Sequence, residues 1–435
     1  MNPTKPRSRF FHYTNLKKKV KPLIAATLLV LSFAVCTDAA DWPHWRGPNG
    51  DGISMEADWN PRALEEGPII VWRTNVGFGY SNVAIKDECL YTIGRDITDC
   101  VVVCLNAATG RKIWQYSFQS TENPQCTPTV DGEFVYVLSK EGILLCLKTK
   151  DGKVKWRKNI VEEYHARVPF YGFAGSPVVA GNLLILTVNT AGMALDKNTG
   201  EMVWGSGEPP KLKYHFSYTS TGVEYATPVI YEQGGTRYAV VSSYKGLHSV
   251  EVKTGKLNWL FDWEEIYRDA GVQVADPIVF DDRLFNVQYY SGYLGGFLLD
   301  IGEKAPKIVW KNSDMFSQTS SPVMIDGHLY FCQGGIEKGL GSLQCFDIAT
   351  GKMNWEENLE RKPISLTAAG GMLIILDNKG NIFIAKADPS NYKEISRGTI
   401  PDQKSFQKWT TPPVLCGGKL YCRSDDGDLV CIDVR

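Results

Sequence analysis

The sequence predicts an all-β protein, a single eight-bladed β-propeller made of four-stranded antiparallel blades. Three patterns lead to this fold: a glycine followed four residues later by tryptophan, Ser-Pro or Thr-Pro pairs between these copies, and short apolar runs after each pair. The complete copies of the first pattern are Gly110 to Trp114, Gly152 to Trp156, Gly200 to Trp204, Gly255 to Trp259 and Gly351 to Trp355. A motif that recurs at a regular period indicates one supersecondary unit used many times.

The tryptophans give the length of the unit. Trp72 stands one interval before the first complete copy, and Trp310 keeps the spacing from Pro306 without the glycine. From Trp72 to Trp355 the successive intervals are 42, 42, 48, 55, 51 and 45 residues. Units of roughly 40–50 residues with four strands each are typical of propeller blades.

The segment around each Thr-Gly pair predicts a tight hairpin turn. An acid or amide stands three residues before the threonine-glycine step, as Asn106 and Asp347 do. Its side chain closes the turn on backbone N–H groups, and glycine takes the positive φ that other residues resist. The Lys-x-x-Trp stretch that follows alternates polar and apolar residues, so we expect an outer strand whose indole packs against the next blade.

Counting the strands after the Ser-Pro and Thr-Pro pairs gives eight blades. These runs are Leu90–Ile93, Val135–Leu138, Leu183–Thr187, Tyr238–Val241, Leu284–Val287, Leu329–Phe331, Leu373–Leu376 and Leu420–Cys422. The last unit stops at Arg435 before any outer strand, while residues 69–72 form an outer strand with no unit before them. We therefore expect the two fragments to complete one blade and close the ring. Only the blade ending near residues 392–398 lacks the tryptophan.

The first 40 residues are typical of an export signal, so we expect a periplasmic or cell-envelope location. Residues 1–21 carry seven Lys or Arg and no acid, the apolar run Pro22–Val35 follows, and small residues precede Asp41. A retained anchor is the alternative, but the run is shorter than the ~20 residues that a membrane span needs. Lipidation at Cys36 is disfavoured because the nearby Phe33 and Val35 are bulky.

The rest of the chain is mildly acidic and reads as one domain. The whole chain has 47 Lys and Arg and 48 Asp and Glu. Residues 1–40 contain seven of the basic residues and one acid, so 40 basic and 47 acidic residues remain without them, a net charge of −7. Without a basic stripe, nucleic-acid binding has little support.

Cys104, Cys146, Cys345 and Cys431 occupy one equivalent place in four blades, which favours core packing over disulfides. Pairs such as Cys89 with Cys100, or Cys416 with Cys422, stay open as disulfides.

The run from Asp41 to Pro48, Asp-Trp-Pro-His-Trp-Arg-Gly-Pro, together with the Thr-Gly-x-x-x-Trp repeats, resembles the exported PQQ-like propeller repeat proteins of bacteria. The group is similar to BamB, a propeller subunit of outer-membrane protein assembly, and more distantly to quinoprotein dehydrogenases. The resemblance covers about residues 41–435. It implies the fold strongly and the function weakly, because the repeated residues are structural in every branch.

The resemblance leaves two classes of function. The first is a non-catalytic scaffold that binds a protein partner or a small ligand at the inter-blade loops, with envelope protein assembly as its setting. The second is a dehydrogenase of alcohols or sugars, which in that family requires PQQ and calcium, an Asp base and often a disulfide between adjacent cysteines. This chain has no Cys-Cys pair and is shorter than those enzymes. The scaffold is the prediction, with no catalytic residue, metal or cofactor, and the dehydrogenase is the alternative.

Candidate ligand-binding residues lie in the long connections between blades, because function concentrates in variable loops on a rigid scaffold. One hypothesis is a funnel that stacks a planar ligand and pairs its carboxylates with Arg167; the other is that these side chains only pack the loops. The candidates are His165, Arg167, Tyr171, Tyr214, His215, Tyr218 and Asp276. Asp276 stands where most blades have Ser or Thr before Pro. Its carboxylate either caps a backbone N–H, or it acts as a base or as a metal ligand, with Glu224 as the candidate companion ligand.

The segment between the leader and the ring, residues 41–68, is predicted to form a clasp. We expect Trp42, Trp45, Arg46 and the Gly47-Pro48 turn to lie against the outside of the ring, with Arg46 paired or stacked on an indole. An exposed aromatic patch for a partner is the alternative. The propeller itself is expected to span residues 69–435.

Overall fold

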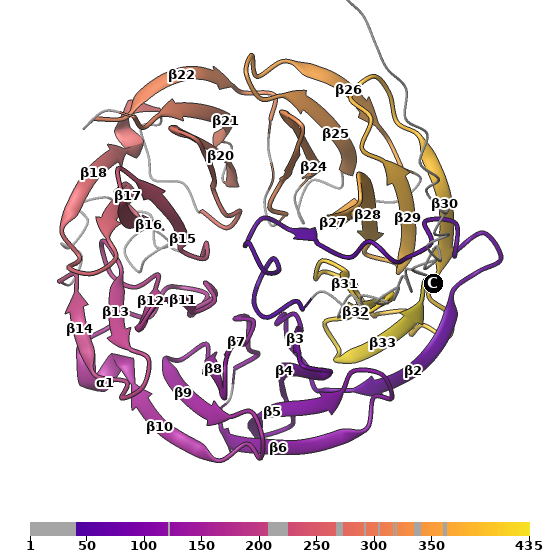
Figure 1. The fold of residues 1–435 in the computed structure, drawn as a ribbon, viewed down its shortest axis with the longest axis horizontal. Helices are drawn as coiled ribbons and strands as arrows, with labels where there is room; N and C mark the ends of the chain where they lie inside the picture. The colour runs from indigo at the N-terminus through magenta and orange to yellow at the C-terminus, as the bar shows by residue number, and fades with distance from the viewer. Residues whose placement is uncertain are drawn as a thin grey trace, which may run out of the picture. The chain divides into compact units, whose positions relative to one another are not determined.

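The computed structural model describes residues 41–120, 122–207, 225–266, 273–290, 293–302, 305–315, 317, 320–334, 341–359 and 363–435. These residues belong to one compact unit, Ala39–Arg435. Eight antiparallel sheets stand around a common axis like the blades of a fan (Figure 1). The predicted eight-bladed propeller is therefore confirmed, and the eight apolar runs lie in the second strands of the blades, except that Thr187 stands one residue past the strand Leu183–Leu186.

The blades follow one another along the chain. Blades 1 and 2 are β3 (Ala84–Lys86), β4 (Cys89–Arg95), β5 (Asp99–Asn106), β6 (Lys112–Gln119), and β7 (Thr129–Asp131), β8 (Phe134–Leu138), β9 (Ile143–Lys148), β10 (Val154–Asn159). Blades 3 and 4 are β11 (Val178–Ala180), β12 (Leu183–Leu186), β13 (Met193–Asp196), β14 (Met202–Gly205), and β15 (Val229–Gln233), β16 (Thr236–Ser242), β17 (Gly246–Glu251), β18 (Leu257–Asp262).

The second half of the ring repeats the pattern. Blades 5 and 6 are β19 (Ile278–Phe280), β20 (Arg283–Tyr290), β21 (Tyr293–Asp300), β22 (Lys307–Asn312), and β23 (Val323–Ile325), β24 (His328–Gly334), β25 (Gly341–Asp347), β26 (Met353–Glu357). Blades 7 and 8 are β27 (Pro363–Ala369), β28 (Met372–Asp377), β29 (Asn381–Lys386), β30 (Glu394–Thr399) with β1 (Ile53–Ser54), and β31 (Val414–Cys416), β32 (Lys419–Arg423), β33 (Asp428–Asp433) with β2 (Ile69–Asn75). Two short helices, α1 (Ile160–Tyr164) and η2 (Trp263–Glu265), follow outer strands.

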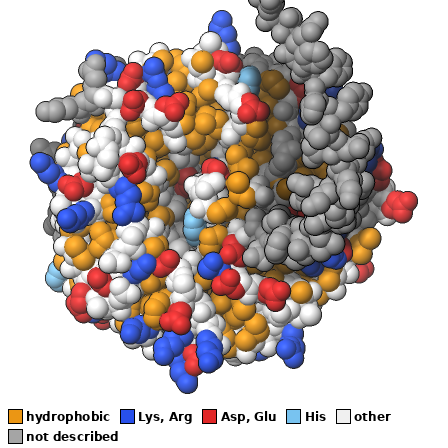
Figure 2. Space-filling view, in the orientation of Figure 1, with side chains coloured by type: hydrophobic (Ala, Val, Ile, Leu, Met, Phe, Trp, Pro, Cys, Tyr) orange, Lys and Arg blue, Asp and Glu red, His pale blue; other side chains and the backbone are white. Residues whose placement is uncertain are grey.

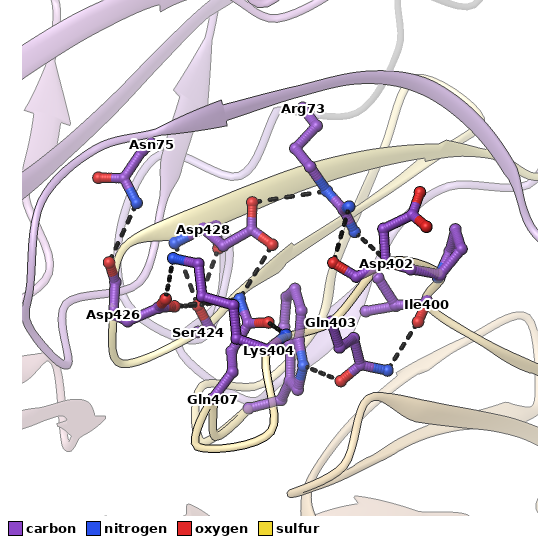
Figure 3. A network of polar contacts seen from close by, with 12 residues as sticks. Arg73, Asn75, Ile400, Asp402, Gln403, Lys404, Gln407, Ser424, Asp426 and Asp428 are labelled. Atoms are coloured by element: carbon purple, nitrogen blue, oxygen red, sulfur yellow. Dashed lines mark hydrogen bonds and ion pairs between the residues drawn. The ribbon is translucent and has the colours of Figure 1, made fainter.

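The ring closes where the sequence predicts. β2 pairs antiparallel with β33, from Ile69 opposite Asp433 to Asn75 opposite Asp428. A polar network fixes this seam to the connection between blades 7 and 8 (Figure 3). In it, Arg73 donates to the Pro401 carbonyl over 2.6 Å and lies 3.5 Å from the Asp428 carboxylate. Lys404 contacts Asp426 at 2.7 Å.

The recurring glycine and tryptophan meet between blades, not within one. The indole of Trp114 lies against Gly152 of the next blade, and its Nε1 donates to the Thr149 carbonyl over 2.7 Å. Trp72, Trp156, Trp204 and Trp310 donate likewise to a carbonyl of the following turn. Trp259 instead donates to the Tyr231 hydroxyl, and its next blade has Pro306 where the glycine would stand. The tryptophans that donate to a following turn thus join neighbouring blades.

The cysteines pack as small apolar residues. Cys104 lies between Tyr91 and Trp114 on neighbouring strands, and Cys146, Cys345 and Cys431 repeat this arrangement. All ten cysteines of the described part, including both pairs left open above, are free thiols. Burial raises the pKa of Cys146 to about 12, so its thiol stays protonated.

Candidate binding sites at the axis and rim of the ring

The two ends of the ring differ. Every inner strand begins, and every outer strand ends, at the end that carries the connections between blades, here called the loop face. The opposite end carries the Thr-Gly turns and is called the turn face. Side chains of every kind fill the middle of the ring in the view down its axis (Figure 2).

The residues before proline, together with Asn82 before Val83 in blade 1, form a belt around the axis. In each link, a backbone N–H of one blade donates to the side-chain oxygen at the equivalent position of the next blade. The links are Asn82 to Thr127, Thr127 to Ser176, Ser176 to Thr227, Thr227 to Asp276 and Asp276 to Ser321, at 2.8–3.1 Å. The Ser-Pro and Thr-Pro pairs therefore join blades: proline begins the strand, and the preceding side chain satisfies a buried N–H.

Asp276 differs from the other belt residues because its carboxylate has a second oxygen that the belt does not use. Its Oδ1 accepts from Thr227, which confirms the predicted cap on a backbone N–H. Its Oδ2 accepts from the Trp45 indole over 2.6 Å and lies 3.9 Å from the Arg46 guanidinium. Burial raises the pKa of Asp276, against the opposing effects of Arg46, Trp45 and the other donors.

The predicted position of residues 42–48 outside the ring is wrong. Trp42 forms a bridge with Ile85 of an inner strand, and Trp45 and Arg46 contact Asp276 at the axis. Figure 1 shows this segment inside the ring, beside β3, β27 and β31. We call residues 41–56 the plug. It lies inside because Trp42 packs in a buried apolar cluster, and Trp45 and Arg46 meet the buried carboxylate of Asp276.

The plug enters and leaves the channel at the turn face. Asp41 accepts from Lys86 Nζ over 2.9 Å, in the turn between β3 and β4. At the other end, Glu56 accepts from the backbone N–H of Gly417, in the turn between β31 and β32. Between them, Arg46 reaches the loop face and donates to the Pro322 carbonyl over 2.6 Å.

The plug covers only part of the channel. β1 adds a parallel strand to β27, and Ser54 donates to the Leu415 carbonyl over 2.8 Å. On the opposite side, a cavity of about 200 Å³ separates the plug from β11 and β15. Its walls are His44, Trp45, Pro48, Asn49, Gly50, Pro177, Val178, Val179, Thr227, Pro228, Val229, Ile230 and Asp276.

The predicted funnel is only partly in the described residues. Tyr214, His215, Tyr218 and Glu224 lie outside them. His165 is exposed at the end of α1 with φ 54°, and the Arg167 backbone N–H donates to Asn189 over 2.9 Å. In the described part, no hydrogen bond or ion pair joins Asp276 to either residue. The funnel as a ligand site therefore stays a prediction.

Tyr171 belongs to an aromatic cluster on the loop face. Its ring lies 4.8 Å from that of Phe170 and 5.9 Å from that of Tyr225, whose hydroxyl accepts from the Tyr171 N–H. Gln125 Nε2 donates to the Tyr171 carbonyl over 2.6 Å. Other exposed apolar residues in loops of the loop face are Phe78, Tyr80, Ile97, Val168 and Phe406. We call these side chains, with Phe170 and Tyr171, the apolar rim.

The described residues do not fit PQQ with calcium. Among them, no three His, Cys, Asp or Glu side chains are grouped as a metal site would require. Asp276, the one described candidate ligand, already accepts from Thr227, Trp45 and Ser321 and faces Arg46. A calcium site needs six to eight oxygen ligands, and this carboxylate has its capacity occupied by the chain itself.

Sequence reasoning missed the plug and most of the apolar rim. The plug had a visible signal, because residues 41–52 are dense in Trp, Gly and Pro although they lie outside the repeat. No sequence signal pointed to Asp276 as the partner of Trp45 and Arg46, because Asp276 is 231 residues away from Trp45 in the sequence. The rim residues Phe78 and Ile97 stand in short loops with no special pattern.

No helix in the described ranges is both long and apolar enough to cross a membrane.

Two kinds of known protein resemble the chain. It is 24% identical over 377 residues to outer membrane protein assembly factor BamB of Yersinia pestis, which covers 83% of this chain and 87% of that protein. It is 27% identical over 169 residues to the dehydrogenase subunit of a quinone alcohol dehydrogenase of Gluconobacter oxydans, which covers 35% of this chain and only 22% of that protein.

A solved structure agrees on the fold alone. The quinohemoprotein alcohol dehydrogenase of Comamonas testosteroni superimposes with a TM-score of 0.66 at 13% identity, covering 91% of this chain and 80% of that one. The family model described as outer membrane protein assembly factor BamB matches residues 98–357 and 247–435, which together are more than half of the chain. The chain therefore belongs to the BamB family of PQQ-like repeat propellers.

Proposed function

We propose that the protein is a non-catalytic scaffold of the cell envelope that binds a protein partner through the apolar rim and acts in outer membrane protein assembly. The observation that carries this proposal is that the two most exposed large apolar side chains of the described residues, Ile97 at 86% and Phe406 at 69%, stand in loops of the loop face. Exposed apolar side chains on one face of a protein are candidates for contact with a partner.

Arg167 stands in the same connection as Phe170 and Tyr171, three and four residues before them. Its side chain is partly exposed, and the described residues give it no acidic partner. Arginine and large aromatic residues are the groups that dominate the affinity of protein interfaces. We infer a partner surface that presents apolar side chains with at least one carboxylate.

The test is capture of the partner by variants that keep the fold. The full chain is expressed in its own cells with an affinity tag, and outer-membrane assembly components are quantified after purification. Phe170→Ser with Tyr171→Ser, and separately Arg167→Ala, are expected to lower recovery at least tenfold, about 1.4 kcal/mol of binding free energy. Val203→Ser, an exposed substitution on the outer strand β14, is the matched control. Equal recovery with all variants would refute the rim as the binding surface.

The dehydrogenase alternative has its own test, which the relatives of that class justify. Purified protein is mixed with PQQ and calcium and examined for a bound-quinone absorption and for dye-linked oxidation of alcohols and sugars. We expect neither, because Asp276 is already engaged by Thr227 and Trp45. Stoichiometric quinone with turnover would overturn the scaffold proposal.

A further inference from the structure

The inner strands are covered unequally. In blades 2, 7 and 8, on the plug's side of the channel, Val130, Ala368 and Leu415 are buried. In blades 3 and 4, the first two residues of β11 and of β15 are only partly buried, although they lie at the centre of the ring. β11 and β15 are the end strands of their sheets, and no described segment pairs with their free edges.

The plug shows how the edge of an inner strand binds another segment of main chain. Ile53 and Ser54 add to β27 as a parallel strand, and the Ala368 N–H donates to the Gly52 carbonyl over 3.0 Å. The edge of blade 1 binds Trp42 through two backbone hydrogen bonds with Ile85, of 2.8 and 2.7 Å. The Val130 N–H donates to the Pro43 carbonyl over 2.8 Å. Three inner edges therefore already bind extended main chain, which is the mode of recognition called β-strand addition.

The geometry points to a second occupant, and we propose that the free edges of β11 and β15 bind a short, neutral, extended polypeptide segment of a partner as an added strand. A cavity of about 200 Å³ lies in front of both strands. The model for its occupant is β1, an added strand of two residues. This site lies in the channel and is separate from the apolar rim.

The charges of the walls select a neutral segment. The Asp276 carboxylate is held by Thr227, Trp45 and Arg46. The only other titratable group of the wall is His44, whose ring contacts the Trp45 carbonyl at 3.1 Å through Nδ1. Burial lowers the pKa of His44, which keeps this ring neutral near pH 7. A charged occupant would lose its hydration without gaining a partner.

The remaining walls select small or β-branched side chains. Val178, Val179, Val229 and Ile230 offer apolar surface on one side, and Gly50 with Pro48 offers it on the other. β-Branched side chains pack well against strands of this kind. The sequence of β1 with its preceding residue, Gly-Ile-Ser, therefore provides a rational probe.

The experiment uses the full chain and acetyl-Gly-Ile-Ser-amide, whose ends carry no charge. Titration calorimetry is expected to give saturable binding, and hydrogen exchange is expected to slow at residues 178–180 and 229–231. The same peptide with an N-methyl group on the isoleucine nitrogen lacks one N–H donor and is expected to bind at least tenfold more weakly. Equal binding of both peptides, or no saturation at the solubility limit, would overturn the proposal.

A pair of variants locates the site. Val178→Trp places an indole in the cavity from β11 and is expected to weaken peptide binding at least tenfold. Val203→Trp, on the exposed outer strand of the same blade, is expected to leave it unchanged. Unchanged binding by the Val178 variant contradicts the assignment, and the N-methyl comparison decides the question on the wild-type chain if that variant does not fold. Because the rim variants leave β11 and β15 intact, failure of partner capture and failure of peptide binding are separate results.

Discussion

Gly152 and Trp114 touch so closely that a Cβ atom on Gly152 would stand 2.6 Å from a carbon of the indole. Gly152 also has a φ of 70°. The glycine thus does two things: it permits the turn in its own blade, and it leaves space for the tryptophan of the blade before it. Gly110, Gly200, Gly255 and Gly351 stand in the same relation to Trp72, Trp156, Trp204 and Trp310.

Alanine at Gly152 is expected to weaken the contact between blades 1 and 2. The positive φ costs roughly 1–2 kcal/mol, and the clash with the indole adds about 1–3 kcal/mol. Gly132→Ala is the matched control, because Gly132 has a φ of 55° with open space around its Cβ position. Urea unfolding followed by tryptophan fluorescence measures both. Equal losses of unfolding free energy would mean that the indole contact contributes nothing.

Asp276 has two separable roles, and threonine is expected to separate them. Thr is the residue that other blades use in the belt, so Asp276→Thr keeps the acceptor for the Thr227 N–H. It removes the carboxylate that faces Arg46 and Trp45. We expect faster hydrogen exchange in residues 41–56 with a nearly unchanged ring. Asp276→Ala is expected to lose the belt link too, at an additional cost of about 1–3 kcal/mol for the unsatisfied amide. Identical exchange in the two variants would contradict this division.

His248 is expected to make stability depend on pH. Its side chain is 4% exposed in blade 4, and burial lowers its pKa to about 4. The unfolded chain therefore binds a proton at this histidine near pH 6.5 that the folded chain does not bind until about pH 4. Stability falls as pH falls through this window, by up to about 3 kcal/mol. His248→Gln removes this dependence, and urea unfolding at several pH values measures it. A parallel pH profile in the variant would show that other groups cause the loss.

Arg423 joins blade 8 to blade 1 through the Thr92 hydroxyl, and the described residues give it no carboxylate partner. Its guanidinium donates to the carbonyls of Ser81 and Gly77, and burial lowers its pKa to about 9. Arg423→Lys keeps a cation but loses the planar fork of donors, so we expect a loss of about 1–3 kcal/mol per carbonyl left unsatisfied. Faster hydrogen exchange in residues 76–81 is the measured sign. Arg435→Lys, at the exposed end of the chain, is the control and is expected to leave that exchange rate unchanged.

The fold could be predicted from the sequence because its signals are local and repeated. A glycine turn, a proline at a strand start and an indole four residues after glycine each act within one blade or between neighbours. The sites could not be predicted to the same extent, because their contacts join distant residues. Trp45 meets Asp276, and Tyr171 meets Tyr225, through the curvature of the ring and not through any spacing in the sequence. The sequence does indicate that Asp276 can cap a backbone N–H, because Ser or Thr recurs at the equivalent position of other blades.

The blade that lacks tryptophan shows how a broken repeat is completed. Residues that follow the plug pack on its outer strand: Leu64 is fully buried there, and Ser396 donates to the Pro61 carbonyl. Gly398 lies against Pro68. The connection from plug to β2 thus contributes apolar surface where the repeat supplies no indole.

The plug also separates early contacts from late ones during synthesis. Trp42 finds Ile85 in blade 1, which is made soon after it. Trp45 and β2 instead have Asp276 and β33 as partners, which are made much later. Contacts of such long sequence separation form late because loop closure must be achieved before they contribute. We therefore expect the beginning of the plug to attach first, and its remaining contacts to form only when the ring is nearly complete.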